Sequence, residues 1–327
     1  MSALAAISPA QPAPPAHVPV LRAEMLAALA VRPDGSYLDA TFGAGGYSRA
    51  ILAAGARRVV GLDRDPAAVA RGQALAAGQP AFTMLEGCFG DMAAIVARAG
   101  SERLDGIVLD LGVSSAQLAD PARGFSFAAD GPLDMRMSGH GTSAAEFLES
   151  ADEATLADIL FRYGEERASR RIARAIVEQR RRHGPLRRTR ELAALVSRTI
   201  GRQSGRIDPA TRTFQALRIH LNDELGELER ALAAAEELLA PGGRLAVVAF
   251  HSLEDRIVKQ FLAARSGARP RPSRHHPLPE AAPAAPRFRL LTRQPVRPGA
   301  AETLANPRAR SARLRAAERL PEPASGR

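Results

Sequence analysis

The sequence lacks tryptophan, contains one cysteine and has almost no lysine. Cys88 is the single cysteine among 327 residues, so an internal disulfide is excluded and a reducing compartment is favoured. No apolar run reaches the length that spans a membrane, and residues 1–16 lack the basic start and the long apolar core of a signal peptide. The sequence therefore predicts a soluble, cytoplasmic protein whose first 16 residues form a disordered tail rich in alanine and proline.

Aromatic residues make up only 4% of the chain, but alanine, leucine, valine and isoleucine are abundant enough to form a core. A chain of this length can hold two domains, or one domain with a large insertion. Only Lys259 is a lysine among 45 basic residues, which indicates a compositional bias acting on the whole sequence. The placement of the arginines is therefore more informative than the net charge of +10.

The basic residues are concentrated in two segments. Residues 265–327 contain fourteen arginines and four acidic residues, so the other 264 residues have no net charge. Within that neutral part, residues 162–212 contain fifteen arginines and five acidic residues. Two basic segments on a neutral body predict a polyanionic partner contacted at two places. Solvated helix faces and an unstructured tail would account for the same charges.

A glycine-rich turn follows the first apolar run, at residues 37–40. Gly43, Gly45 and Gly46 lie between this expected strand and a helical segment at residues 48–52. Glycines at such a position let backbone N–H groups approach a ligand closely. Asp63 ends the next apolar run and can accept both hydroxyls of an adenosine ribose. The pattern predicts a ligand that contains adenosine, although a tight turn needed only for packing would also fit.

Strand and helix patterns alternate up to residue 110, which predicts a parallel, doubly wound sheet. A helical domain is expected after the fourth strand, because about a hundred residues follow without a strand pattern. A Ser252–Asp255 capping box is expected to open the last long helix, and residues 266–286 are expected to form a mobile loop. The expected strands span residues 37–40, 58–63, 81–85, 104–110, 243–250, 287–294 and 311–318. The expected helices span residues 23–29, 67–76, 156–163, 169–179, 191–200, 222–239 and 254–264.

Eight short motifs occur in a characteristic order between about His17 and Lys259, and a further one at Asn306–Arg310. The eight are TFGAGG (41–46), LDRDP (62–66), LDLGVSS (109–115), RGFSF (123–127), GPLDMRM (131–137), YGEER (163–167), TRTFQA (211–216) and FHSLEDR (250–256). Together they resemble the bacterial ribosomal RNA small subunit methyltransferase H family. Members of this family place a methyl group on N4 of a cytidine in 16S ribosomal RNA.

The resemblance implies an α/β fold of the class I methyltransferases that use S-adenosylmethionine (SAM): a Rossmann-like, mostly parallel sheet of seven strands with an inserted all-α domain. It implies a SAM-binding domain formed by residues 17–117 and 213–327, and an RNA-recognition insert at residues 118–212. The implied target lies in the decoding region (P site) of 16S rRNA in the small ribosomal subunit. No metal, DNA or membrane partner is implied, and both a monomer and a homodimer remain open.

The resemblance also implies roles for individual residues. The implied cofactor contacts are Gly45, Gly46, Tyr47, Asp63, Phe89, Asp110 and Gln117. Candidate catalytic residues are Asp110, Ser114, Ser115 and His251. Candidate RNA-binding residues are Arg170, Arg171, Arg174, Arg180, Arg181 and Arg182. The family often has histidine at the position of Tyr47, so only a backbone contact is expected to be kept there.

Several of these residues have a second interpretation. Asp110 would hold the amino group of SAM, which we favour, or accept hydrogen bonds from the cytosine amine. Phe89 would lie against adenine or pack in the core. Phe125 and Phe127 would stack on an extruded base or pack in the core. His251 would face the substrate or adjoin the cap of the last long helix.

Two other functions fit part of the sequence. An NAD-dependent dehydrogenase would explain the glycine turn and Asp63, but it would leave residues 110–115 and the arginine segments unexplained. An assembly factor without catalytic activity would explain the arginines. It would leave the intact Gly45, Gly46, Asp63 and Asp110 without a role.

Overall fold

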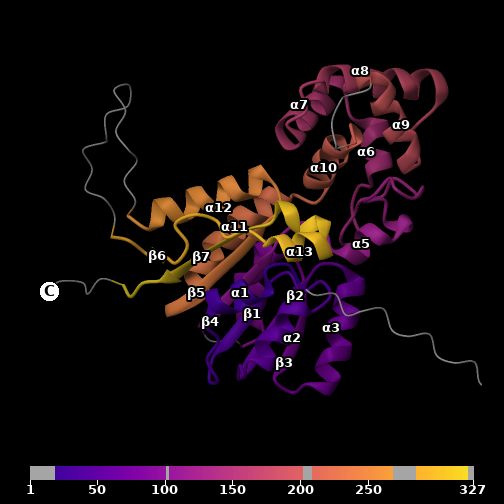
Figure 1. Ribbon diagram of the computed structural model, residues 1–327. Helices are drawn as coiled ribbons and strands as arrows, with labels where there is room; N and C mark the ends of the chain where they lie inside the picture. The colour runs from indigo at the N-terminus through magenta and orange to yellow at the C-terminus, as the bar shows by residue number, and fades with distance from the viewer. Residues whose placement is uncertain (1–18, 101–102, 202–207, 268–284, 323–327) are drawn as a thin grey trace, which may run out of the picture.

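The computed structural model describes residues 19–100, 103–201, 208–267 and 285–322. The expected tail at residues 1–16 and most of the expected loop at residues 266–286 lie outside these ranges. Within them, the chain forms one seven-stranded sheet in the order β3-β2-β1-β4-β5-β7-β6, covered by helices, with a lobe of further helices beside it (Figure 1). The strands are β1 (Ser36–Asp39), β2 (Arg58–Asp63), β3 (Phe82–Glu86), β4 (Leu104–Asp110), β5 (Leu239–Ala249), β6 (Phe288–Leu290) and β7 (Arg313–Arg319).

The first five strands are parallel, and β7 pairs antiparallel with both β5 and β6. The expected α/β fold with a mostly parallel, seven-stranded sheet is therefore confirmed. Neighbouring side chains on a strand point to opposite faces, and both faces of this sheet are buried. Leu38 of β1, for example, belongs to one apolar cluster, and Tyr37 beside it belongs to another. Burial on both faces is why these strands are nearly continuous apolar runs.

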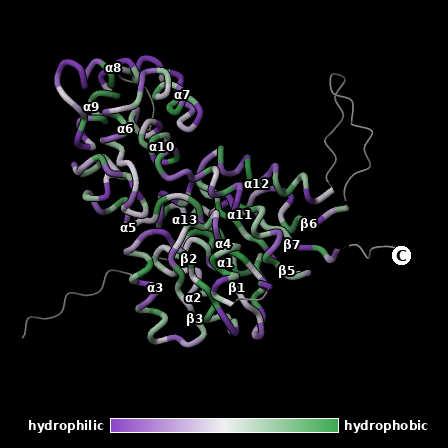
Figure 2. The backbone as a smooth tube through the Cα atoms, turned by 180° about the vertical axis from the view of Figure 1, so that it is seen from behind, coloured by the Kyte–Doolittle hydropathy of each residue, from purple (hydrophilic) through white to green (hydrophobic). Residues whose placement is uncertain are grey.

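Helices cover each face of the sheet. One face packs against α1 (Arg22–Leu29), α2 (Gly46–Ala53) and α3 (Pro66–Gly78). The other face packs against α4 (Met92–Arg98), α11 (Glu224–Leu238) and α12 (Ser252–Arg265). In Figure 2 the most hydrophobic segments gather in this sheet region. Among the residues described, no helix is both long enough and apolar enough to cross a membrane.

The second lobe lies between β4 and α11 in the sequence and has its own apolar core, which includes Phe125, Leu156, Ile172 and Leu217. The domain boundary expected after residue 212 falls inside α10, whose Phe214 and Leu217 pack in this core. The helices of this part are α5 (Ser115–Ala119), α6 (Ala144–Ser150), α7 (Glu153–Gly164), α8 (Ser169–His183), α9 (Thr189–Ile200) and α10 (Ala210–Leu221).

Three local expectations were wrong. Strand β5 begins at Leu239 rather than at Gly243, because Leu239 already pairs with Leu104 of β4. The register then shifts, so that Arg244 pairs with Gly106, and Gly242, in the Pro-Gly-Gly sequence expected as a turn, has a φ of 80° within this irregularity. Strand β6 is shorter than expected and ends at Leu290, although the N–H groups of Leu291 and Thr292 still donate to the carbonyl oxygen of Ala316 in β7. Helix α12 begins at Ser252, and its N-cap is His251, whose capping box is completed by Glu254. Ser252 and Asp255 therefore do not form the expected box.

Candidate active site

A pocket lies at the carboxyl ends of β1, β2 and β4, where parallel sheets commonly bind ligands. Its walls come from the loops after these strands, from Phe89 after β3 and from Phe250 after β5. The C-terminal segment adds Asn306 and Arg308. Of the residues expected to contact a cofactor, those that line this pocket are Gly46, Tyr47, Asp63, Phe89, Asp110 and Gln117. Gly45 is not among the lining residues.

The turn between β1 and α2 is fixed by its glycines and by Asp63. Gly45 has a φ of 76°, and a Cβ at this position would lie 2.6 Å from the ring of Phe42, so no other residue fits without strain. The Gly43 N–H donates a 2.7 Å hydrogen bond to one carboxylate oxygen of Asp63, and the Asp65 N–H donates to the other at 2.9 Å. Burial raises the pKa of Asp63 above its ordinary value, and these amides oppose the rise. Each carboxylate oxygen keeps a lone pair for a ligand hydroxyl.

The side chain of Tyr47 is buried and hydrogen-bonded within the protein. Its hydroxyl donates to the carbonyl oxygen of Val20, and the side chain is buried in the core between α2 and the first described residues. Both Tyr47 and Val20 line the pocket, and the hydroxyl of Tyr47 already uses its hydrogen in this contact.

Asp110 ends β4, and one oxygen of its buried carboxylate accepts no hydrogen bond from any described residue. Its N–H donates to Thr41 Oγ1 at 2.6 Å, and its Oδ1 is buried with no hydrogen-bond partner in the described part of the chain. Burial raises the pKa of Asp110 to about 8, with further increases from the nearby acids Asp39 and Glu254 and a decrease from Arg308. A buried acceptor without a partner is unfavourable. A cationic donor in the pocket would satisfy it.

The loop after Asp110 is held by capping interactions. The Ser114 hydroxyl caps α5 by accepting a hydrogen bond from the Gln117 N–H, and the side-chain oxygen of Gln117, Oε1, accepts one from the Ser114 N–H at 2.8 Å. The Gln117 amide donates to Asp65 at 2.7 Å. Asp65 also caps α3 and accepts a hydrogen bond from Arg123 at 2.7 Å. Ser114 and Gln117 therefore shape one wall of the pocket, and their side chains are largely committed to this network.

Arg308 contributes to this site and was missed as a site residue in the sequence. It lies in a short helix, η3 (Pro307–Ser311), and reaches back to the loop after β4. Its guanidinium donates to Ser115 Oγ at 2.8 Å and to the carbonyl oxygen of Val113 at 3.0 Å. The motif at residues 306–310 is the signal that could have identified it.

Known protein families were compared with the sequence of this chain. A model of the MraW methylase family matches residues 15–320.

The chain belongs to the MraW methylase family.

Two relatives named ribosomal RNA small subunit methyltransferase H are similar along almost their whole lengths. The one from Paramagnetospirillum magneticum is 61% identical over 312 residues, covering 95% of this chain and 98% of the relative. The one from Rhodospirillum centenum is 62% identical over 313 residues, covering 95% and 94%. A solved structure titled as a putative rRNA methylase from Clostridium thermocellum aligns over 93% of this chain and 97% of that chain, at 13% identity and a TM-score of 0.41. The resemblance inferred from the motifs is confirmed. As a methylase the chain is an enzyme, and the dehydrogenase and non-catalytic alternatives are set aside.

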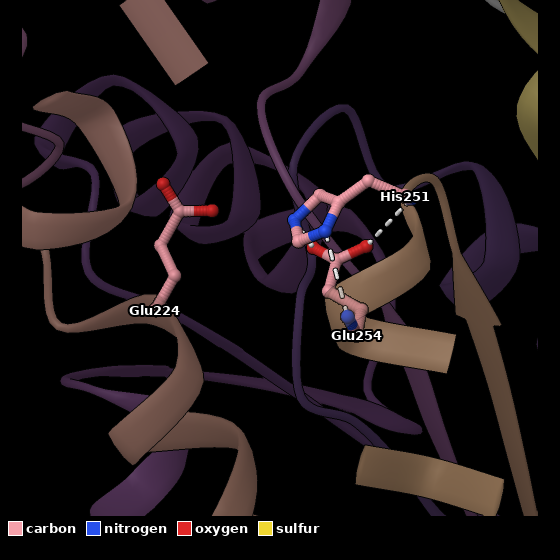
Figure 3. A group of neighbouring side chains, drawn as sticks. All are labelled: Glu224, His251 and Glu254. Carbon is pink, nitrogen blue, oxygen red and sulfur yellow. Dashed lines mark hydrogen bonds and ion pairs between the residues drawn. The ribbon is translucent and has the colours of Figure 1, made fainter. Parts of the chain in front are cut away.

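His251 does not line the pocket of this methylase. Its Nδ1 accepts a hydrogen bond from the Glu254 N–H at 3.4 Å, and its Nε2 lies 3.1 Å from Glu254 Oε1 without an aligned hydrogen bond (Figure 3). Glu224 stands across from the ring, and ligand atoms of the three residues lie within 4.8 Å of one another. Glu224 is already engaged by Arg218 through two hydrogen bonds, of 2.7 and 2.8 Å. The group is therefore a buried charge network beside the β5–α12 junction.

Phe125 and Phe127 lie in the core of the helical lobe. Phe125 is buried there, and Phe127 packs edge-on against Phe214, with ring centroids 4.8 Å apart. The Phe125 ring is therefore not available to stack on a base, whereas Phe127 is only partly buried and keeps some exposed surface. Phe89, by contrast, lies partly buried at the pocket wall, where it also packs against the sheet core.

Three of the candidate RNA-binding arginines lie in the first part of α8. Arg170, Arg171 and Arg174 are all exposed. Arg171 donates to the carbonyl oxygen of Thr199, and Arg174 lies 3.6 Å from Glu153. Arg170 has no partner within the described ranges. Arg170 is therefore more readily available to a polyanion than Arg171 and Arg174, which already have partners within the protein.

The other three arginines end α8 and divide into two kinds. Arg180 donates to the carbonyl oxygens of Leu148 and Ala151, at 2.9 and 2.6 Å, and so satisfies the C-terminal end of α6. Arg181 and Arg182 are exposed and have no partner among the residues described. Arg180 therefore has a structural task that the sequence did not reveal.

Proposed function

We propose that this methylase transfers the methyl group of SAM to the exocyclic N4 of a cytidine in the decoding region (P site) of 16S rRNA. The observation that carries the proposal is that Asp63 and Asp110 line the same pocket, at the carboxyl edge of the sheet. The relatives' name, ribosomal RNA small subunit methyltransferase H, supports the choice of substrate.

The residues in this pocket fit the two ends of SAM. Asp63 would accept the ribose hydroxyls, and the backbone at Gly45, Gly46 and Tyr47 would approach the ligand closely. Phe89 would lie against the adenine. The unpaired Oδ1 of Asp110 would accept a hydrogen bond from the amino group of the methionine portion. Gln117 would then act by shaping the wall through Asp65.

Bound SAM would supply an electrophilic methyl group, and the protein would position the amine beside it. The lone pair of N4 is delocalised into the cytosine ring, so the amine is a poor nucleophile. Oxygen acceptors in the loop formed by residues 110–115 would hold its N–H groups and turn the lone pair toward the methyl group. Such catalysis depends on positioning and on a preorganised electrostatic site. The proton released from N4 would pass to one of these oxygens or to water.

The wider setting belongs to the same proposal. Residues 17–117 and 213–327 would form the SAM-binding domain, and residues 118–212 would contact the RNA through exposed arginines such as Arg181 and Arg182. The enzyme would work in the cytoplasm on the small ribosomal subunit or its precursors.

Calorimetric titration with SAM and, separately, with NAD tests the ligand. We expect SAM to bind in a 1:1 ratio and NAD to give no binding heat. Binding of NAD without SAM would overturn the proposal. Asp63→Ala should weaken SAM binding, because it removes the acceptor of the ribose hydroxyls. As a control, Ala77→Ser on the exposed end of α3 should leave SAM binding unchanged.

A further inference from the structure

A second hollow lies on the helical lobe, between α7 and the start of α8. We call it the α7–α8 groove. It shares no lining residue with the pocket at the sheet edge, and its helices lie at the outer end of the lobe (Figure 1). Its lining includes Ala157, Asp158 and Phe161 from α7, and Arg167, Arg170 and Arg174 from the other side.

Phe161 is the unusual residue in this groove. Its side chain is 60% exposed, and only Leu304 is also a large, exposed apolar residue in the described part of the chain. Helix α7 turns Leu156, Ile159 and Leu160 into the core, so Phe161 projects from the opposite side. Isolated exposed apolar residues are common on proteins. What distinguishes Phe161 is that it lies in a hollow lined by arginines.

The groove has a positive charge, because its two acidic residues are paired with arginines and further arginines remain. Asp158 is paired with Arg162 at 2.8 Å, and Glu153 lies 3.6 Å from Arg174. Arg167 and Arg170 are exposed and have no partner among the residues described. The groove therefore offers an aromatic ring beside two uncommitted guanidinium groups.

We propose that the α7–α8 groove binds an unpaired segment of RNA, with one base stacked on Phe161 and the adjoining phosphates on Arg167 and Arg170. Aromatic faces beside basic residues are how proteins hold single-stranded nucleic acid, because every base has a face to stack. A duplex presents phosphates but no free base face, so it would leave Phe161 unused. The inference rests on the proposed function, for which the groove would be a second contact with the substrate RNA, remote from the methyl transfer.

The absence of tryptophan from the chain makes a direct test possible. Phe161→Trp creates a single fluorescent reporter in the groove, and Ala77→Trp creates a matched one on the exposed end of α3. The probe is a mixed-sequence RNA 12-mer, added without SAM, either single-stranded or annealed to its complement. We expect the single strand to quench the reporter at position 161 and to leave the one at position 77 unchanged. Equal quenching by the duplex, or none at all, would overturn the proposal.

Affinity measurements separate stacking from other contacts. Phe161→Ala should weaken binding of the single strand by about 5- to 150-fold, the range expected for one stacked base. Phe161→Tyr should retain the affinity, and Phe161→Leu should lose it as Ala does, because leucine keeps apolar area without a ring face. Retention of single-strand affinity by Phe161→Leu would overturn the proposed stacking of a base on the ring. A change in sedimentation with Phe161→Ala in the absence of RNA would indicate a second copy of this chain.

The proposed function can fail independently of this inference. The binding assays use no methyl donor, so single-strand binding at Phe161 would stand even if the enzyme methylated another RNA. If the proposed function also holds, Phe161→Ala should raise the KM for the RNA substrate and leave kcat nearly unchanged, because a remote contact is made equally in the ground and transition states. A fall in kcat at unchanged KM would contradict the placement of this contact away from the chemistry.

Discussion

Protonation of Asp110 should control how tightly this enzyme holds its cofactor. The pKa of Asp110 is raised to about 8, mainly by burial. An α-amino group also has a pKa of roughly 8. If the carboxylate holds the ammonium group of the ligand, binding requires Asp110 to be ionised and the amine to be protonated. At pH 8 roughly one quarter of encounters meet both conditions, and at pH 6 roughly one in a hundred.

Affinity should therefore be greatest near pH 8 and fall about 25-fold by pH 6, which corresponds to about 1.9 kcal/mol. The assay is calorimetric titration with SAM in the absence of RNA, so that no methyl acceptor is present. Asp110→Asn should weaken binding at pH 8 by about 1.5–3 kcal/mol, the value of a charged hydrogen bond. The variant should also lack the acidic limb of the pH profile.

Two results would refute this reasoning. One is a wild-type affinity that changes less than about threefold between pH 6 and pH 8. The other is an acidic limb that persists in Asp110→Asn. A limb centred near pH 6 would instead point to Asp39, whose pKa burial raises to about 6. If Asp110 serves the cytosine amine, cofactor affinity should stay nearly constant and the single-turnover rate should fall in Asp110→Asn.

Because the folded-state pKa of Asp110 is raised, its carboxylate destabilises the free protein progressively as pH rises from about 4 to 8, so Asp110→Asn should raise Tm more at pH 8 than at pH 5 in thermal unfolding. Arg308→Gln removes two hydrogen bonds to the loop after β4 and should weaken SAM binding by about 1 kcal/mol in calorimetry, whereas Arg310→Gln, an equal change of charge, should not. The double variant of Arg181→Glu and Arg182→Glu should reduce the steepness with which RNA affinity falls as salt rises. The slope of log K against log salt concentration should change by roughly 0.7–0.9 for each phosphate that the protein no longer binds. Arg180 is left in place because it supports α6, and an unchanged slope would show that the RNA binds elsewhere.

The central sheet could be predicted from the sequence because its strands are buried on both faces. The bounds of β2 and β4 were predicted correctly, since each is a short apolar run that ends at an aspartate. The end of strand β6 was placed too late because its segment alternates arginines with apolar residues up to Leu291, so the sequence does not mark where pairing stops. The cap of α12 was misplaced because His251 supplies a ring nitrogen as the acceptor, where sequence rules expect serine.

The pocket was predictable in part. Asp63 and Asp110 could be chosen because they end parallel strands of one sheet, and such ends meet at the same edge. Arg308 could not be placed, because the residue that it binds, Ser115, is 193 positions away in the chain. The role of Arg180 was hidden for a similar reason. A run of three arginines gives no sign of which guanidinium turns inward to the carbonyl oxygens of α6.

The most direct test of the proposed activity is methylation of unmodified small ribosomal subunits with labelled SAM, followed by mapping of the product. The account predicts one labelled cytidine in the decoding region of 16S rRNA, with the methyl group on N4, and no label with Asp63→Ala. Methylation of a different base or of a ring carbon, or label that appears in DNA and not in the subunit, would contradict it.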